Sequence, residues 1–123
     1  MQFGRTGLEM GSIGLGCWAI GGPFTDLNAA AGWGDVDDRE SLRALRAGLE
    51  MGAGYLDTAN IYGCGHSERL VGRAIKGLRD RVVISSKFGI LCDEESRATT
   101  GQIGSARDVF ASCEGSLRRL GTD

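Results

Sequence analysis

A run of three β-branched residues, Val82-Val83-Ile84, constrains the fold more than any other feature of the chain. The run has no polar alternation, so the strand that it predicts is covered on both faces, which is typical of a parallel sheet. Two further short strands are expected at residues 13–16 and 55–57. Parallel strands need long crossover connections, and segments with helical periodicity follow each of these strands.

Three segments carry apolar residues at helical spacing. The first begins at Asp37 and ends at Gly52, the second begins at Ser67, and the third runs from Ser105 to Gly121. Asp37 and Ser105 each have an acidic residue three positions later, which is the spacing of a capping box, and glycine commonly ends a helix. The apolar stripes are Leu42, Leu45 and Leu49, then Leu70, Val71, Ala74, Ile75 and Leu78, and then Val109, Cys113, Leu117 and Leu120.

The order of these elements predicts a single α/β domain over residues 1–123. A short hairpin that turns at Thr6-Gly7 comes first, and three strand-helix units with right-handed crossovers follow it. The stretches 21–34 and 92–104 have no apolar period, so both are expected to be loops.

The balance of charge excludes several classes of partner. Lys and Arg number 14 against 16 Asp and Glu, a net charge of -2, so the basic excess that a phosphate backbone requires is missing and no nucleic acid is expected. No apolar run approaches the roughly 18 residues of a membrane-spanning helix, and the first residues lack the apolar core of a secretory signal. A cytoplasmic protein without membrane contact is therefore expected.

Polar side chains are expected together at the C-terminal ends of the parallel strands, where such folds gather catalytic groups. Gly16-Cys17-Trp18 follows the first strand, Asp57 ends the second, Tyr62 lies in the next loop and Lys87 follows the third. An ammonium beside a phenol stabilises the phenolate and lowers the phenol pKa from about 10, which makes the tyrosine a better proton donor. A carboxylate beside the lysine keeps the ammonium charged and in place.

Each of these three side chains also has a structural interpretation. Asp57 would cap the following turn, Tyr62 would simply pack, and Lys87 would be an exposed strand end. Spacing alone does not separate these interpretations from a catalytic one.

The stretch from Asp57 to Glu68 reads D-T-A-N-I-Y-G-C-G-H-S-E, and Gly72 follows it. It resembles the aldo-keto reductase pattern D-T-A-x-x-Y-G-x-G-x-S-E-x-x-x-G. Four other segments resemble the same family in the same order. They are G-R-T-G-L at 4–8, G-L-G-C-W at 14–18, K-F-G at 87–89 and S-L-R-R-L-G-T-D at 116–123. The resemblance covers essentially the whole chain.

This resemblance implies a (β/α)8 barrel of the TIM type, closed at its bottom by the N-terminal hairpin, that uses NADPH to reduce small aldehydes or ketones to alcohols. In that family a tyrosine is the general acid and is paired with a lysine and an aspartate, roles that carry over to Tyr62, Lys87 and Asp57. The cofactor supplies the hydride, and the protein supplies placement and charge. The expected cofactor-binding residues are Gly16, Cys17, Trp18 and Asp57. Trp18 and Phe88 are the expected apolar wall of the substrate pocket.

Two departures from the family pattern limit what this chain is expected to do. The family's catalytic histidine ends a fourth strand, whereas the only histidine here, His66, occupies a variable position of the motif and is expected in a loop near a helix start. A barrel of this type has about 250 residues. The three βα units are therefore expected to form a partial barrel, part of a truncated chain that is inactive alone.

Two other functions fit the same pattern. One is a nucleotide-binding barrel protein that regulates a partner, and the other is a half-barrel module that covers its edges by self-association. The intact Asp57, Tyr62 and Lys87 favour the enzyme. A metal site is not expected, because Cys64 and His66 would be two ligands without partners and the scattered cysteines are expected to be reduced thiols.

Overall fold

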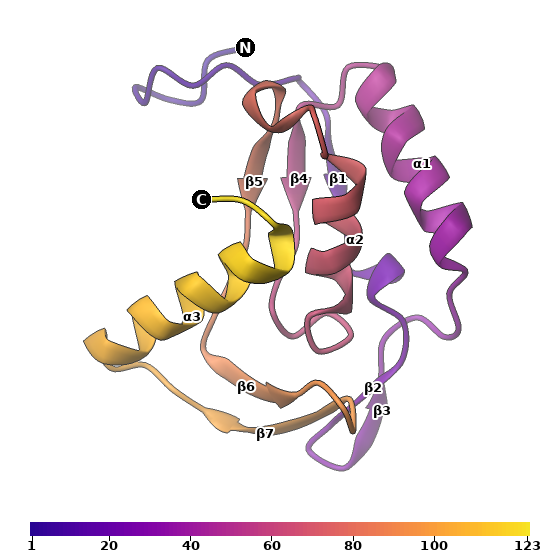
Figure 1. Cartoon of the computed structure of the whole chain (residues 1–123), viewed down its shortest axis with the longest axis vertical. Helices are drawn as coiled ribbons and strands as arrows, with labels where there is room; N and C mark the ends of the chain where they lie inside the picture. The colour runs from indigo at the N-terminus through magenta and orange to yellow at the C-terminus, as the bar shows by residue number, and fades with distance from the viewer.

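Three short strands lie side by side as a parallel sheet in the order β1-β4-β5 in the computed structural model, which describes residues 1–123 (Figure 1). They are β1 (Gly14–Gly16), β4 (Tyr55–Asp57) and β5 (Val83–Ser85). The pairing register places Gly16 opposite Asp57 and Asp57 opposite Ser85, so the three strands end in one row. We call this row the C-terminal rim.

Three α-helices complete the units: α1 (Asp38–Glu50), α2 (His66–Ala74) and α3 (Ala106–Leu120). The expected caps of α1 and α3 are confirmed, since the Asp37 carboxylate accepts two backbone N–H groups and Ser105 forms a capping box with Asp108. The helix α2 begins one residue earlier than expected. Its N-cap is Gly65 in the left-handed conformation, and the Ser67 hydroxyl is turned into the core instead.

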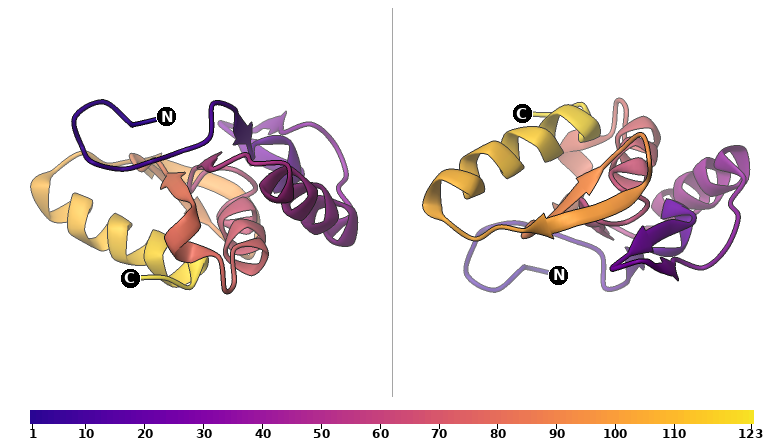
Figure 2. Two further views of the ribbon diagram at one scale, coloured as in Figure 1. Left: turned by 90° about the horizontal axis from the view of Figure 1, so that it is seen from above. Right: turned by 90° about the horizontal axis from the view of Figure 1, so that it is seen from below.

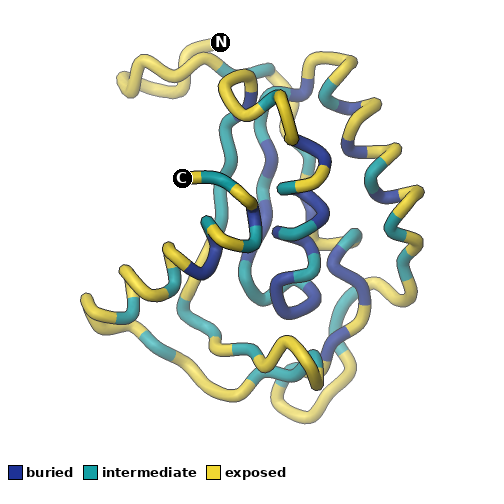
Figure 3. Tube along the Cα trace, in the orientation of Figure 1, coloured by how far each residue is buried: buried dark blue, intermediate teal, exposed yellow.

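The helices lie on one side of the parallel sheet and the N-terminal segment lies on the other, as Figure 2 shows. Helix α2 packs between α1 and α3. Buried residues are concentrated where α2 faces β4 (Figure 3), and Leu56, Leu70 and Val71 are at most 1 % exposed. Burying each such side chain stabilises the fold by roughly 1.5–3 kcal/mol, so the layer between α2 and β4 holds the domain together.

Both stretches expected to be loops contain strands. The first includes β2 (Phe24–Asp26) and β3 (Ala29–Ala31), the second includes β6 (Ile90–Asp93) and β7 (Ala98–Gln102), and the four form one sheet in the order β3-β2-β7-β6. These strands escaped prediction because they bury few side chains and are held mainly by backbone pairing. In Figure 1 this sheet lies below the C-terminal rim.

Three other expectations are corrected. Strand β5 is half-buried rather than covered on both faces, because it is the edge strand of its sheet. The stripe of α3 is buried only near its C-terminal end, and Val109 and Cys113 are exposed where the helix projects from the body (Figure 1). The N-terminal hairpin is present but minimal, with one bridge between Gln2 and Glu9.

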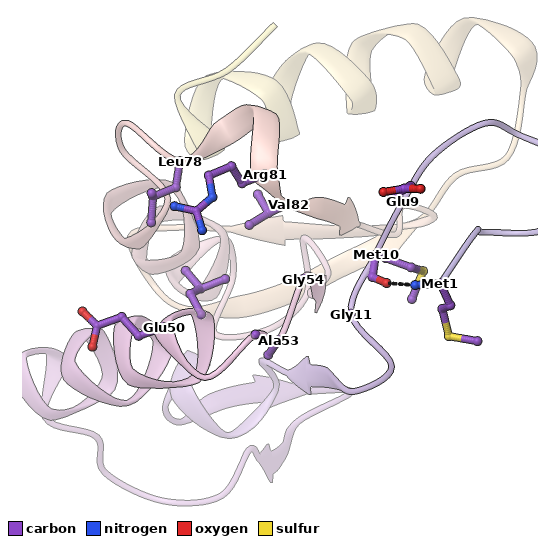
Figure 4. A pocket seen from close by; sticks show the side chains of 12 residues that line it. Met1, Glu9, Met10, Gly11, Glu50, Ala53, Gly54, Leu78, Arg81 and Val82 are labelled. Atoms are coloured by element: carbon purple, nitrogen blue, oxygen red, sulfur yellow. Dashed lines mark hydrogen bonds between the residues drawn. The ribbon is translucent and has the colours of Figure 1, made fainter.

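A cavity of about 540 Å³ lies at the opposite end of the sheet from the C-terminal rim (Figure 4). Gly11, Gly54 and Val82, which come just before the three parallel strands, are among its lining residues. None of the three helices has the length and apolar character that a membrane crossing requires.

Candidate active site

Lys87 is the centre of a polar cluster at the C-terminal rim. Its Nζ atom lies 2.6 Å from Oδ1 of Asp57, 2.9 Å from the carbonyl oxygen of Thr58 and 3.3 Å from the hydroxyl of Tyr62. The ammonium also lies 5.0 Å from the centre of the Tyr62 ring. The structure therefore brings together the three residues that the sequence singles out as a proton-donor site.

Backbone hydrogen bonds hold these side chains in place. Asp57 ends β4, and Lys87 lies two residues after the end of β5. Beyond the paired strands, the Thr58 N–H donates to Ser85 and the Asn60 N–H donates to the carbonyl of Lys87. The Asn60 side chain donates to the carbonyl of Ile90 at 2.6 Å, which fixes the loop that carries Tyr62.

The ammonium of Lys87 is stabilised in its charged form. Burial alone would lower the pKa of Lys87, but its hydrogen bonds to Asp57 and Tyr62 outweigh burial and raise that pKa above the ordinary lysine value. The side chains of Lys87 and Asp57 are 48 % and 36 % exposed, so the pair is open to a ligand from solvent.

An aromatic cluster lies beside this polar cluster. The Trp18 ring stacks on the Tyr62 ring with centroids 5.9 Å apart, and Trp33 meets Trp18 edge-on at 5.6 Å. The sequence interpretation missed Trp33, although a tryptophan between two glycines in a polar stretch is a detectable signal. Trp33 is 71 % exposed and widens the apolar surface at the rim.

Of the other residues expected at the site, Gly16 lies at the rim, whereas the side chains of Cys17 and Phe88 lie away from it. Gly16 lies at the rim, and a Cβ atom at this position would meet nothing within 4 Å. The Cys17 side chain is in the core and 1 % exposed, so only its backbone reaches the rim. Phe88 is 46 % exposed and lines, with Val109 and Leu117, a cavity of about 320 Å³ between β5 and α3.

His66 is the first residue of α2 rather than part of the preceding loop. Its Nε2 lies 2.7 Å from Oδ1 of Asp38, so it links the starts of α1 and α2. The thiol of Cys64 is buried, and burial raises its pKa. No group of three or more metal-ligating side chains gathers anywhere in the chain.

The chain is similar to known aldo-keto reductases. The curated aldo-keto reductase YhdN of Bacillus subtilis is 40 % identical over 120 residues, which cover 96 % of this chain and 33 % of that protein. The holo structure of an aldo-keto reductase from Bacillus halodurans superposes with a TM-score of 0.80 at 28 % identity, covering 100 % of this chain and 36 % of that one. The chain thus spans about a third of the length of the relatives it matches.

A third relative carries a nucleotide. It is an aldo-keto reductase from Klebsiella pneumoniae solved in complex with NADPH, with a TM-score of 0.62 at 35 % identity, covering 89 % of this chain and 31 % of that one. These structures confirm the expected fold class, a partial TIM-type barrel. The Aldo/keto reductase family model matches residues 12–123. The chain therefore belongs to the aldo/keto reductase family.

Proposed function

We propose that this chain forms the N-terminal part of the active site of an NADPH-dependent reductase that converts small aldehydes or ketones into alcohols. The observation that supports this proposal most is the single ammonium, Lys87, that contacts both Asp57 and Tyr62. Neither a turn cap nor a packing tyrosine requires that arrangement. An oxidoreductase is also what membership of the family indicates.

In the proposed mechanism Tyr62 is the general acid. Its hydroxyl proton passes to the carbonyl oxygen of the substrate, and the oxygen left on Tyr62 carries negative charge. The Lys87 ammonium, 3.3 Å from that oxygen, stabilises the charge. Asp57 holds the ammonium in place and balances its charge. Trp18 is proposed as an apolar surface beside the substrate, since its partly exposed ring stacks on Tyr62, whereas the expected second surface, Phe88, faces the cavity between β5 and α3.

The rim is suited to a nicotinamide ring. Gly16 leaves open space beside the end of β1, Trp18 is 43 % exposed, and the Asp57 carboxylate is partly exposed. We propose that these residues and the backbone of Cys17 hold that ring, with the Cys17 thiol taking no part because it lies in the core. When bound, NADPH supplies the hydride that reduces the carbonyl carbon.

The test uses a chimera in which residues 1–123 replace the matching N-terminal third of the Bacillus subtilis relative. We expect the chimera to oxidise NADPH with 4-nitrobenzaldehyde and the 123-residue chain alone to show little activity. Tyr62→Phe should lower kcat by roughly 10²–10⁴-fold, the usual value of general acid catalysis. Tyr55→Phe is the matched control, since it removes the hydroxyl of the other tyrosine.

Two results would contradict the proposal. Equal kcat in the Tyr62→Phe and Tyr55→Phe chimeras would remove Tyr62 from the reaction. A folded chimera that binds NADPH tightly but reduces no carbonyl compound would favour the regulatory alternative. Circular dichroism and a cooperative urea transition establish that each chimera is folded.

A further inference from the structure

A second polar cluster lies directly behind Lys87, on the helical side of the sheet. The Glu68 side chain of α2 accepts a hydrogen bond from the Ser86 hydroxyl at 2.6 Å and another from Nε of Arg119 at 2.6 Å. Arg119 lies near the end of α3 and also contacts Glu94 at 3.3 Å. The cluster thus joins α2, α3, the β6–β7 turn and the segment that carries Lys87.

The burial of Glu68 makes this cluster unusual. The Glu68 side chain is 0 % exposed and Arg119 is 20 % exposed. Desolvating such a pair offsets much of its attraction, so a buried ion pair is weak support for stability, whereas removing one partner is strongly destabilising. Both carboxylate oxygens of Glu68 are hydrogen-bonded. The Glu68–Arg119 pair therefore fixes the position of the groups that it contacts, including the Ser86 hydroxyl.

Ser86 transmits that position to the rim. Side chains alternate along an extended segment, so Ser86 points toward the helices while Lys87 points toward Asp57 and Tyr62. Backbone hydrogen bonds from Thr58 and Asn60 hold the same segment on its other side. The segment 85–87 is therefore held by its backbone along the sheet and by the Ser86 side chain on the helical face.

We propose that the Ser86–Glu68–Arg119 chain of hydrogen bonds is a positioning device that holds the Lys87 ammonium against Asp57 and Tyr62. Ser86, Glu68 and Arg119 touch no reacting atom in this proposal and act only through Lys87. The glycine at the α2 N-cap belongs to the same device, because a Cβ atom at Gly65 would meet the Arg119 side chain. The proposal rests on the proposed function only in giving Lys87 a catalytic role.

The test measures Lys87 itself and needs no turnover. The chain has two lysines, Lys87 and the exposed Lys76, so trace acetylation near neutral pH followed by mass spectrometry gives a labelling ratio with an internal reference. Acetylation requires the neutral amine. We expect Ser86→Ala to raise the Lys87:Lys76 ratio by roughly threefold or more, because a lysine that loses its hydrogen bonds has a lower pKa and a larger neutral fraction.

Ser105→Ala is the matched control. It also removes a serine hydroxyl that hydrogen-bonds to a carboxylate, that of Asp108, but at the far end of α3. We expect it to lower stability while leaving the labelling ratio unchanged. Ser86→Thr keeps the hydroxyl and should restore the original ratio. Ser86→Cys, which keeps the volume but donates more weakly, should give an intermediate ratio and replaces the alanine variant should that variant unfold.

An unchanged ratio in folded Ser86→Ala or Ser86→Cys would overturn the proposal, and so would an equal rise in Ser105→Ala, which would indicate general loosening. Failure of the reductase proposal is detected separately, by NADPH oxidation in the chimera. If Ser86→Ala leaves the labelling ratio unchanged while the chimera oxidises NADPH, the positioning proposal is wrong. If the ratio rises as expected but the chimera reduces no carbonyl compound, the reductase proposal is wrong.

Discussion

The Lys87 ammonium lies 2.6 Å from the carboxylate of Asp57, which ends β4, and Lys87 comes just after the neighbouring strand β5, whose end is in register with that of β4. This contact is one of those that raise the pKa of Lys87. The stabilisation that comes from a raised lysine pKa is complete below the unfolded-state value, 10.5, and is lost as the pH rises through the folded-state value.

Asp57→Asn should lower the pKa of Lys87, because the amide keeps the shape of the carboxylate but not its charge. The measurement is an NMR titration of the Lys87 Cε resonance, with Lys76 as the internal reference. Asp35→Asn, at an exposed position, should leave both resonances unchanged. A Lys87 titration that is the same in wild type and Asp57→Asn would show that the contact does not hold in solution.

Cys17 should be far less reactive than Cys113. Burial, with a smaller effect of the Asp57 charge, raises the pKa of the Cys17 thiol to about 12, whereas Cys113 is exposed on α3. With iodoacetamide near neutral pH, peptide mass spectrometry should find Cys113 modified first and Cys17 modified only after unfolding. Alkylation of Cys17 in the folded chain at a rate equal to that of Cys113 would contradict its placement in the core.

The same raised pKa gives a dependence of stability on pH. Between 9.0 and about 12 the unfolded chain loses the thiol proton of Cys17 and the folded chain retains it, so the free energy of unfolding should fall as the pH rises through this range. Urea unfolding at several alkaline pH values measures the slope. Cys17→Ala should reduce the slope, and an unreduced slope would assign it to other groups.

Gly72→Ala should destabilise the chain by about 1–3 kcal/mol, although alanine normally favours a helix over glycine. Gly72 lies within α2, and a Cβ atom there would overlap the carbonyl of Leu120 at the end of α3. Gly104→Ala is the control, because its Cβ atom would meet nothing within 4 Å. Urea unfolding distinguishes them, and a stabilised Gly72→Ala chain would mean that α2 and α3 are further apart.

Leu56→Ala should cost about 2–5 kcal/mol, because this side chain is 0 % exposed in the layer between β4 and α2. Leu27→Ala, at a side chain that is 83 % exposed, should change the free energy of unfolding by less than about 0.5 kcal/mol. Equal free energies of unfolding for the two variants, measured by urea unfolding, would argue against a folded core in the isolated chain.

The order of the three helices and the three parallel strands could be predicted from the sequence, because each helix buries an apolar stripe and alternates with a short apolar strand. The stripes that include Leu45 in α1 and Val71 in α2 have helical periods, and Asp37 and Ser105 mark helix starts by their chemistry. The strands β2, β3, β6 and β7 could not be predicted. Ala29-Ala30-Ala31, for example, has no alternation to detect, and its pairing partner is known only from the fold.

The candidate site was predictable to a similar degree. Asp57, Tyr62 and Lys87 lie at strand ends or in a strand-helix loop, and parallel strands bring such residues to one edge. The sequence did not indicate that Trp33 or Glu68 contributes to the site. Trp33 reaches the rim through the β2–β3 hairpin, and the burial of Glu68 depends on Arg119, 51 positions further along the chain.

Because β1, β4 and β5 end in register, the candidate site lies at one end of the sheet, and the packed layer that stabilises the fold lies between the strands and the helices. In the proposed reaction, substrate preference would depend on exposed side chains in the loops beyond Gly16, Asp57 and Ser85, whereas the layer around Leu56 stabilises the fold against heat and denaturant. An engineer can therefore diversify the exposed loop positions, such as Trp18 and Phe88, while keeping the buried ones, such as Cys17 and Thr58, that belong to the packed interior. The Glu68–Arg119 pair is the exception under our positioning proposal, in which a substitution made there for stability would also move the Lys87 ammonium.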